Sequence, residues 1–241
     1  MEPIDDGDVE RVLIVTAHPD DLDFGAGGTI AQWTEKGISV SYCICTNGDQ
    51  GGKDPSIQRA DVPNIRQREQ RDAGRVLGVT DIHFLNYVDG SLAPTLELRK
   101  DIVRIIRKVR PQRLVIQYPE RNWERIFSSH PDHMASGEAA MQAVYPDAGN
   151  PFAFQNLSMI EGLQPWTVSE VWVIGSNTPN HHIDITQSFD RKIAALRAHV
   201  SQTAHAENLQ QRIKEWGEQS AQKFRLPIGS IAEAFMVVSI I

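Results

Sequence analysis

The sequence predicts one α/β domain built on a mostly parallel sheet with helices on both faces. Short apolar runs alternate along the chain with longer segments of helical periodicity, which is the pattern of repeated strand–helix units. The first run, Val12-Leu13-Ile14-Val15, is rich in β-branched residues and is not interrupted by polar ones, as is typical of a strand buried on both faces. The predicted fold is therefore Rossmann-like, with right-handed crossovers and a carboxyl-terminal α/β extension.

The chain has 241 residues, the length of one large domain, which we place at residues 11–241 after a flexible tail at residues 1–10. The formal net charge of -7 and the lack of a basic stripe argue against a nucleic acid partner. No apolar stretch is long enough to cross a bilayer, and the acidic amino terminus is unlike a signal peptide. Cys43 and Cys45 suit buried thiols in a reducing compartment. We therefore expect a soluble cytoplasmic protein that acts on a small molecule and has no membrane partner. The sequence does not define the oligomeric state, and a homo-oligomer is compatible with it.

The first half of the chain contains three predicted strands, each followed by polar loop residues or a helix. Gly37 and Gly78 are natural helix stops, and residues 47–55 consist of turn-forming residues that leave the end of a strand. The expected elements are strands at 11–16, 39–46 and 82–85, helices at 27–36 and 64–77, and loops at 47–55 and 86–94.

In the second half, Thr95 is the expected N-cap of a helix whose apolar stripe faces the core, and Pro111 closes it. Residues 145–166 lack periodicity and are rich in Pro, Gly and aromatic residues, so we expect a lid or a substrate wall there. The expected elements are helices at 96–109, 133–144, 188–201 and 206–216, and strands at 113–117, 170–174, 182–185 and 234–240.

Two His-Pro-Asp motifs follow predicted strands, where open α/β sheets place their functional sites. His18 and Asp21 are three residues apart, so they share one side of a turn that enters a helix. His130 and His133 repeat this spacing, and one of them can complete a set of two His and one Asp. Such a set suits zinc or a similar divalent ion and leaves a position open for water. Asp20 is then the carboxylate within reach of that water.

A helix-capping role and a nucleotide-binding role fit these motifs less well than a metal site. A single His-x-x-Asp at a helix start usually caps the helix, but the presence of two His-Pro-Asp motifs at one edge of the sheet favours a metal. The run Gly25-Ala26-Gly27-Gly28 lacks the Gly-x-Gly-x-x-Gly spacing of a dinucleotide-binding loop. It also follows two carboxylates that would repel a pyrophosphate.

The motifs resemble those of the PIG-L/LmbE-like zinc-dependent N-deacetylases, a family that includes mycothiol- and bacillithiol-type N-acetylglucosamine (GlcNAc) deacetylases. The first family motif is matched by Ala17-His18-Pro19-Asp20-Asp21 followed by Gly27-Gly28-Thr29, and the second by His130-Pro131-Asp132-His133. The resemblance covers most of the chain, with weaker matches at Thr46-Asn47-Gly48-Asp49 and at Arg110-Pro111.

This resemblance implies Zn2+, or Fe2+ in the cell, held by His18, Asp21 and His133. It implies a hydrolase that removes an N-acetyl group from an amino sugar conjugate of the GlcNAc type. Water on the metal would attack the amide, with Asp20 as the general base. The alternatives are an amidase of a thiol–sugar conjugate, a deacylase of a glycosylated natural product, and a non-catalytic sugar- or nucleotide-binding module.

Four further residues have expected roles. The resemblance implies His130 as an imidazolium beside the oxyanion, and we expect Asp132 to keep it charged and oriented. It also suggests Arg66 and Asp89 as substrate-binding residues, although a solvated helix charge explains Arg66 equally well.

The chain departs from the family pattern in two places. Asp23 stands where the family commonly has Glu, and Ser128 stands where some members carry a mobile tyrosine. His199 and Gln202 match a family pattern near the carboxyl terminus, but we expect them to serve structural packing.

Overall fold

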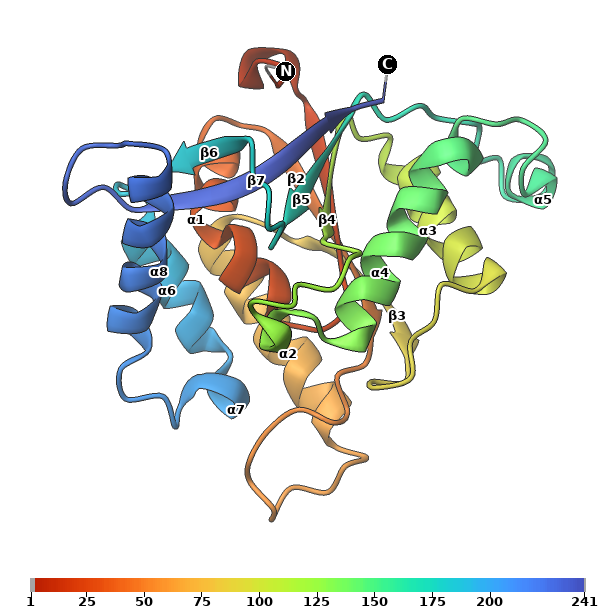
Figure 1. Ribbon diagram of the computed structural model, residues 1–241. Coiled ribbons are helices and arrows are strands. Elements are labelled where there is room, and N and C mark those ends of the chain that lie inside the picture. The colour runs from red at the N-terminus through yellow and green to blue at the C-terminus, as the bar shows by residue number, and fades with distance from the viewer. Residues whose placement is uncertain (1–2, 241) are drawn as a thin grey trace.

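The computed structural model describes residues 3–240 and contains a seven-stranded sheet in the order β3-β2-β1-β4-β5-β7-β6 (Figure 1). Strands β1 to β5 are parallel to one another, whereas β7 runs antiparallel to both β5 and β6. This confirms the predicted α/β class and mostly parallel sheet. The strands are β1 (Arg11–Thr16), β2 (Ser39–Thr46), β3 (Asp81–Tyr87), β4 (Arg113–Gln117), β5 (Glu170–Ile174), β6 (His181–Asp184) and β7 (Ala232–Ser239).

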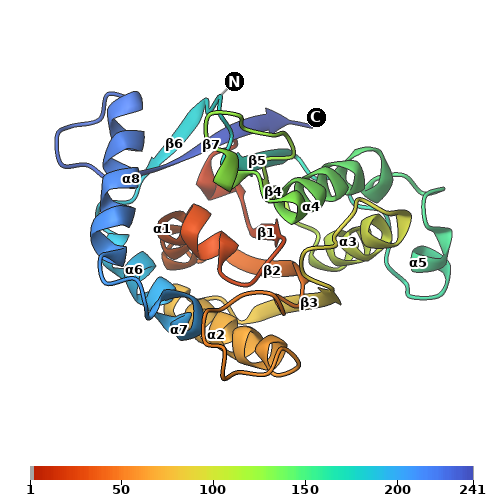
Figure 2. The ribbon, with the colours of Figure 1, turned by 60° about the horizontal axis from the view of Figure 1, so that its bottom comes forward.

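Helices cover both faces of the sheet, with α1, α2, α6, α7 and α8 on one side and α3, α4 and α5 on the other (Figure 2). None of the described helices is both long and apolar enough to span a membrane. The α-helices are α1 (Asp21–Glu35), α2 (Val62–Leu77), α3 (Leu96–Val109), α4 (Pro131–Gln142), α5 (Gln155–Met159), α6 (Phe189–Ala198), α7 (Val200–Thr203) and α8 (Leu209–Lys223). The shorter helical segments are η1 (Asp6–Asp8), η2 (Ile126–Ser128) and η3 (Ala143–Ala148).

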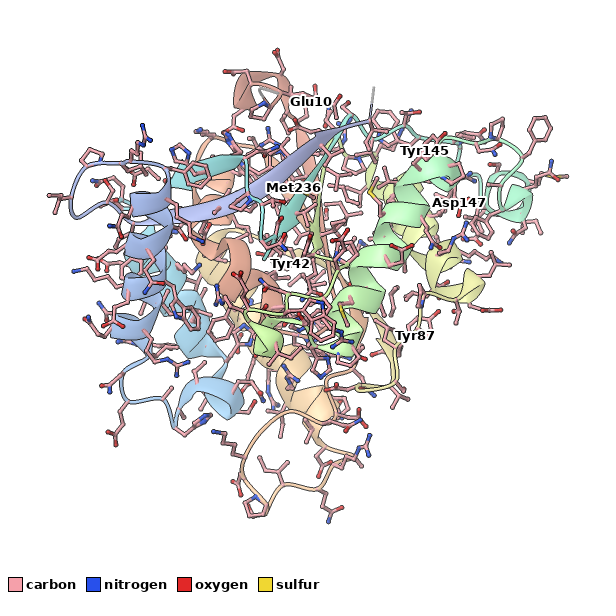
Figure 3. All side chains as sticks on the ribbon, in the orientation of Figure 1. Glu10, Tyr42, Tyr87, Tyr145, Asp147 and Met236 are labelled. Carbon is pink, nitrogen blue, oxygen red and sulfur yellow. The ribbon has the colours of Figure 1, made fainter. Side chains whose placement is uncertain are left out.

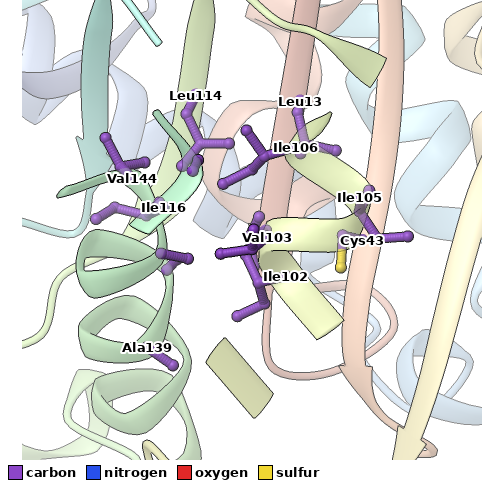
Figure 4. Packing of buried hydrophobic residues seen from close by; sticks show 14 of the residues in the cluster. Leu13, Cys43, Ile102, Val103, Ile105, Ile106, Leu114, Ile116, Ala139 and Val144 are labelled. Atoms are coloured by element: carbon purple, nitrogen blue, oxygen red, sulfur yellow. The ribbon is translucent and has the colours of Figure 1, made fainter. Parts of the chain in front are cut away.

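The sheet separates two large hydrophobic clusters, and β1 contributes to both. Leu13 faces the cluster under α3 and α4, where it joins Ile106 and Leu114 (Figure 4). Val12 and Ile14 face the opposite cluster, under α1 and α2. Because successive strand residues point to opposite faces, a strand between two cores must be apolar throughout. The uninterrupted apolar run at the start of the chain is thereby explained.

The amino-terminal segment makes specific contacts, in contrast to the flexible tail expected from the sequence. The Ile4 N–H donates to Glu170 at 2.9 Å, and Asp6 pairs with the buried Arg113 at 2.7 Å. These contacts hold the described part of the tail against the amino end of β4 and β5. Residues 1 and 2 of the expected tail lie outside the described residues.

Helix α1 begins at Asp21, six residues earlier than the sequence pattern indicates. Its glycines are helical residues that allow close packing, and they do not form a loop before the helix. A β-carbon on Gly25 would lie 2.7 Å from Ile174, and one on Gly28 would lie 2.7 Å from Ile185. The glycines therefore let α1 approach the sheet and the segment after β6 closely.

Residues 145–166 do not form the expected lid or substrate wall. Tyr145 and Asp147 lie beyond the carboxyl end of α4 (Figure 3), and the buried Arg107 of α3 donates to the carbonyl of Ala148. Trp166 donates its indole N–H to the carbonyl of Pro111 at 2.7 Å, at the amino end of β4. The segment thus packs against α3 and the edge of the sheet opposite to the carboxyl ends of the parallel strands.

Candidate active site

The two His-Pro-Asp motifs meet at the carboxyl ends of the neighbouring strands β1 and β4. His18 lies just after β1, and His130 is the N-cap of α4, which follows the loop leaving β4. Gln117, the last residue of β4, accepts the backbone N–H of Ala17 at 2.7 Å and so ties the two strand ends together. The predicted convergence of the two motifs is confirmed.

Three donor groups from the motifs face one point. His18 Nδ1 lies 3.2 Å from His133 Nε2 and 3.3 Å from Asp21 Oδ2, and His133 Nε2 lies 3.0 Å from Asp21 Oδ1. Tetrahedral coordination with bonds of about 2.0–2.1 Å places ligand atoms about 3.3 Å apart. The two imidazole nitrogens contact different oxygens of Asp21, and this close approach of nitrogen and oxygen donors suits zinc or a similar divalent ion.

The other nitrogen of His18 faces two carboxylates. His18 Nε2 lies 3.1 Å from Asp89 Oδ1 and 3.2 Å from Asp132 Oδ2, so these three residues form a second group of potential ligands. Asp132, however, already accepts the backbone N–H groups of Gly90 at 2.7 Å and Leu92 at 3.1 Å. A carboxylate held in this way can fix the orientation of an imidazole that binds a metal. It keeps the imidazole proton on Nε2, which leaves the lone pair of Nδ1 free for an ion.

The electrostatics of the site favour a bound cation. Burial by itself lowers the pKa of His18, but the carboxylates of Asp21, Asp132 and Asp89 outweigh it and raise that pKa to about 12. Burial raises the pKa of Asp21, whereas His133 and His18 hold it well below its usual range. The carboxylates thus stabilise positive charge at this point, whether a proton or a metal ion carries it.

Asp20 lies beside the donor groups in an unusual backbone conformation. Its φ of 91° and ψ of -27° are left-handed, a conformation that costs a non-glycine residue about 1–3 kcal/mol and is concentrated at functional sites. Burial raises the pKa of Asp20 to about 6, with the Arg66 guanidinium opposing the shift and Asp21 adding to it. A carboxyl group with this pKa can both accept and donate a proton near neutral pH.

His130 differs from the expected imidazolium. The backbone N–H of Asp132 donates to His130 Nδ1 at 3.2 Å, so that nitrogen is an acceptor and the ring proton lies on Nε2. Burial and the neighbouring His18 and His133 lower the pKa of His130. The Asp132 carboxylate contacts His18 and not His130, so the expected pairing of Asp132 with His130 is wrong. The contact and the lowered pKa both favour a neutral imidazole at His130, with its N–H on Nε2.

The two residues suggested for substrate binding have protein partners. The buried Arg66 donates to the carbonyls of Gly48 at 3.0 Å and Pro19 at 2.5 Å, and it lies 3.4 Å from the carboxylate of Asp20. Asp89 is directed at His18 Nε2. Arg66 therefore holds the first motif against the loop after β2, and a contact of either residue with substrate stays a prediction.

A cleft of about 310 Å³ opens beside the donor groups. Asp21 and His133 line it, together with Tyr118 of the loop after β4 and Trp216 of α8. Its position at the carboxyl edge of the sheet gives a small molecule access to these donor groups.

One buried group of residues is not predictable from the motifs. Asp23, whose partner the sequence leaves undefined, lies 2.7 Å from His199 Nε2 and 2.9 Å from Gln70 Nε2. The sequence pattern suggests only packing for His199 and no role for Gln70. The indication in the sequence is the match of His199 to a family pattern near the carboxyl terminus.

Comparison with known proteins agrees with this site. Residues 13–144, more than half of the chain, match the PIG-L family, described as GlcNAc-PI de-N-acetylase. The chain is 36% identical over 195 residues to a diacetylchitobiose deacetylase of Thermococcus kodakarensis, covering 81% of this chain and 71% of the relative. It is 35% identical over 212 residues to a probable N-acetyl-α-D-glucosaminyl L-malate deacetylase 2 of Bacillus cereus, covering 85% of this chain and 89% of the relative.

A solved structure shows the same architecture. The N,N'-diacetylchitobiose deacetylase from Pyrococcus horikoshii, in complex with an inhibitor, superimposes with a TM-score of 0.87 at 31% identity. The match covers 97% of this chain and 85% of that one. On the combined strength of the motif match, the relatives and the fold, the chain belongs to the PIG-L family.

Proposed function

We propose that this protein is a zinc-dependent hydrolase that removes the N-acetyl group of a GlcNAc-type amino sugar conjugate. The observation that carries the proposal is the cluster of His18, Asp21 and His133 beside an open cleft: His18 Nδ1 lies 3.2 Å from His133 Nε2, and each of these nitrogens lies within 3.3 Å of one oxygen of Asp21. The relatives named above support it, because their names describe deacetylases of chitobiose and of GlcNAc conjugates.

His18, Asp21 and His133 would hold the ion. When bound, zinc supplies a Lewis acid that polarises an amide carbonyl and makes water more acidic. Asp132 keeps the His18 ring oriented and its proton on Nε2, so that Nδ1 is available as a ligand. Fe2+ suits the same nitrogen and oxygen donors, and we propose zinc because two imidazole nitrogens and one carboxylate, with a position left open, are a ligand set typical of catalytic zinc.

Asp20 and His130 move or donate the protons. Asp20 accepts a proton from the attacking water and returns one to the departing amine, a double role that suits its pKa of about 6. His130 donates from Nε2–H to the developing oxyanion as a neutral imidazole. Removal of one such donor typically lowers kcat by about 10²–10³-fold.

The cellular setting follows from the chemistry of the chain. Cys43 and Cys45 are buried free thiols in β2, which fits a reducing compartment such as the cytoplasm. A small amino sugar conjugate fits the size of the cleft beside the metal ligands.

Acetate release from a panel of N-acetylated amino sugars tests the proposal. We expect GlcNAc conjugates to be deacetylated, a chelator to abolish the release, and added zinc to restore it. Cleavage of a thiol–sugar amide or of a longer acyl chain would assign the protein to one of the two alternative hydrolase classes. A protein that binds sugar without metal and cleaves none of these amides would contradict the proposal and favour a binding module.

A further inference from the structure

The left-handed conformation of Asp20 has a dedicated hydrogen-bond partner on another helix. The Asp20 backbone N–H donates to Gln70 Oε1 of α2 at 2.7 Å. The Gln70 side chain is fully buried, so its amide has few alternative partners in water. The partner is thus placed to favour the backbone geometry that directs the Asp20 carboxylate.

The orientation of the Gln70 amide is in turn fixed by a carboxylate. Gln70 Nε2–H donates to Asp23 Oδ2 at 2.9 Å, which leaves Oε1 directed at the Asp20 N–H. A flipped amide would bring its NH₂ group against the Asp20 N–H and its oxygen against the Asp23 carboxylate. Both contacts would be repulsive, so only one amide orientation is compatible with the site.

Asp23 is fixed by His199, which comes from a distant part of the chain. His199 Nε2 lies 2.7 Å from Asp23 Oδ2, and both side chains are fully buried. His199 stands at the junction of α6 and α7, with φ of -81° and ψ of 62°, so the helix predicted over 188–201 breaks where this ring turns inward. Next to it, Glu69 of α2 accepts both the N–H and the hydroxyl of Ser201 at 2.7 Å.

We propose that Gln70, Asp23 and His199 are positioning residues that set the geometry of the general base Asp20. The proposal rests on the proposed function, because it concerns the base of that reaction. Asp23 and His199 have no place in metal binding or proton transfer, yet their buried chain of contacts ends on the Asp20 backbone.

Gln70→Met tests the link to Asp20, since methionine has nearly the same length but no group that accepts the Asp20 N–H. We expect kcat to fall at least tenfold, with KM and zinc content within about twofold of the wild-type values. A crystal structure of the variant should show that Asp20 has left the left-handed region. Unchanged kcat together with an unchanged Asp20 backbone would overturn the proposal.

His199 provides a graded test. Glutamine at this position can still donate to Asp23, whereas leucine cannot, so His199→Gln should retain several-fold more kcat than His199→Leu. Glu170→Gln is the matched control, because it perturbs a buried carboxylate at the opposite edge of the sheet, where Glu170 binds Arg113 at 2.6 Å. The decrease in kcat is compared with the decrease in melting temperature for His199→Gln, His199→Leu and Glu170→Gln. If the two decreases are proportional, with the same ratio in all three variants, His199 contributes only to stability and the proposal is wrong.

The structural measurement separates this proposal from the proposed function. A wild-type protein that deacetylates no amino sugar would contradict the proposed function. The Asp20 conformation in crystals of Gln70→Met would still decide whether Gln70 holds that residue.

Discussion

Asp132→Asn is the substitution that most directly tests how the protein prepares His18 for a metal ion. Asp132 is fully buried and accepts three hydrogen bonds: Gly90 N–H and His18 Nε2 reach Oδ2, and Leu92 N–H reaches Oδ1. Asparagine has the same shape but only one accepting oxygen. Its NH₂ group must therefore face either Leu92 N–H or the side shared by Gly90 and His18.

Either placement weakens metal binding. With the NH₂ group toward His18, the imidazole would have to accept at Nε2, which puts its proton on Nδ1 and removes the lone pair that faces Asp21 and His133. With the NH₂ group toward Leu92, a backbone donor is left unpaired and the negative charge beside His18 is lost. Loss of such a supporting carboxylate typically lowers metal affinity about 10–100-fold, equivalent to about 1.4–2.8 kcal/mol.

The assay is competition between the protein and a fluorescent zinc chelator, measured for the wild type, Asp132→Asn and a control. Asp101→Asn is the control, because Asp101 also accepts a hydrogen bond, from the Tyr87 hydroxyl at 2.8 Å, but belongs to α3 and not to the site. We expect a 10–100-fold higher Kd for zinc in Asp132→Asn and an unchanged value in the control. A Kd within about threefold of wild type in a folded Asp132→Asn protein would refute the role given to Asp132.

The other predictions concern the remaining site residues. Asp20→Asn should retain zinc but lose about 10²–10⁴-fold in kcat, as expected for removal of a general base; near-normal turnover would contradict the mechanism. His133→Ala should lose the metal, measured by elemental analysis, whereas His130→Ala should keep it and lower kcat far more than substrate affinity; equal metal loss in both would make His130 a ligand. For the metal-free protein, the pKa of His18 is raised from 6.5 to about 12, so protonated His18 stabilises the fold fully below about pH 6.5, and this stabilisation is lost as the pH rises toward about 12. The melting temperature of the metal-free protein should therefore fall from about pH 7 to about pH 10, and this fall should be smaller in His18→Gln; equal slopes would show that His18 is not the titrating group.

Local sequence patterns were sufficient for the sheet and for the convergence of the two His-Pro-Asp motifs. The apolar run of β1 indicated a strand between two cores, and the residues of that strand do face opposite clusters. The repeated His-Pro-Asp spacing indicated two turns at strand ends, and the structure brings His18, Asp21 and His133 together there. These features depend on residues within a few positions of each other, so periodicity and spacing carry them.

What the sequence by itself determined is therefore the α/β class, the approximate positions of the strands and the two His-Pro-Asp motifs that supply the candidate metal ligands. The tertiary structure alone decided that Asp132 supports His18 and not His130, and that Asp23 meets His199 across 176 positions of the chain. It also placed residues 145–166 away from the site. The physical reason is that a buried carboxylate binds whichever donor the packing of helices against the sheet brings within about 3 Å, and that packing is a property of the whole fold.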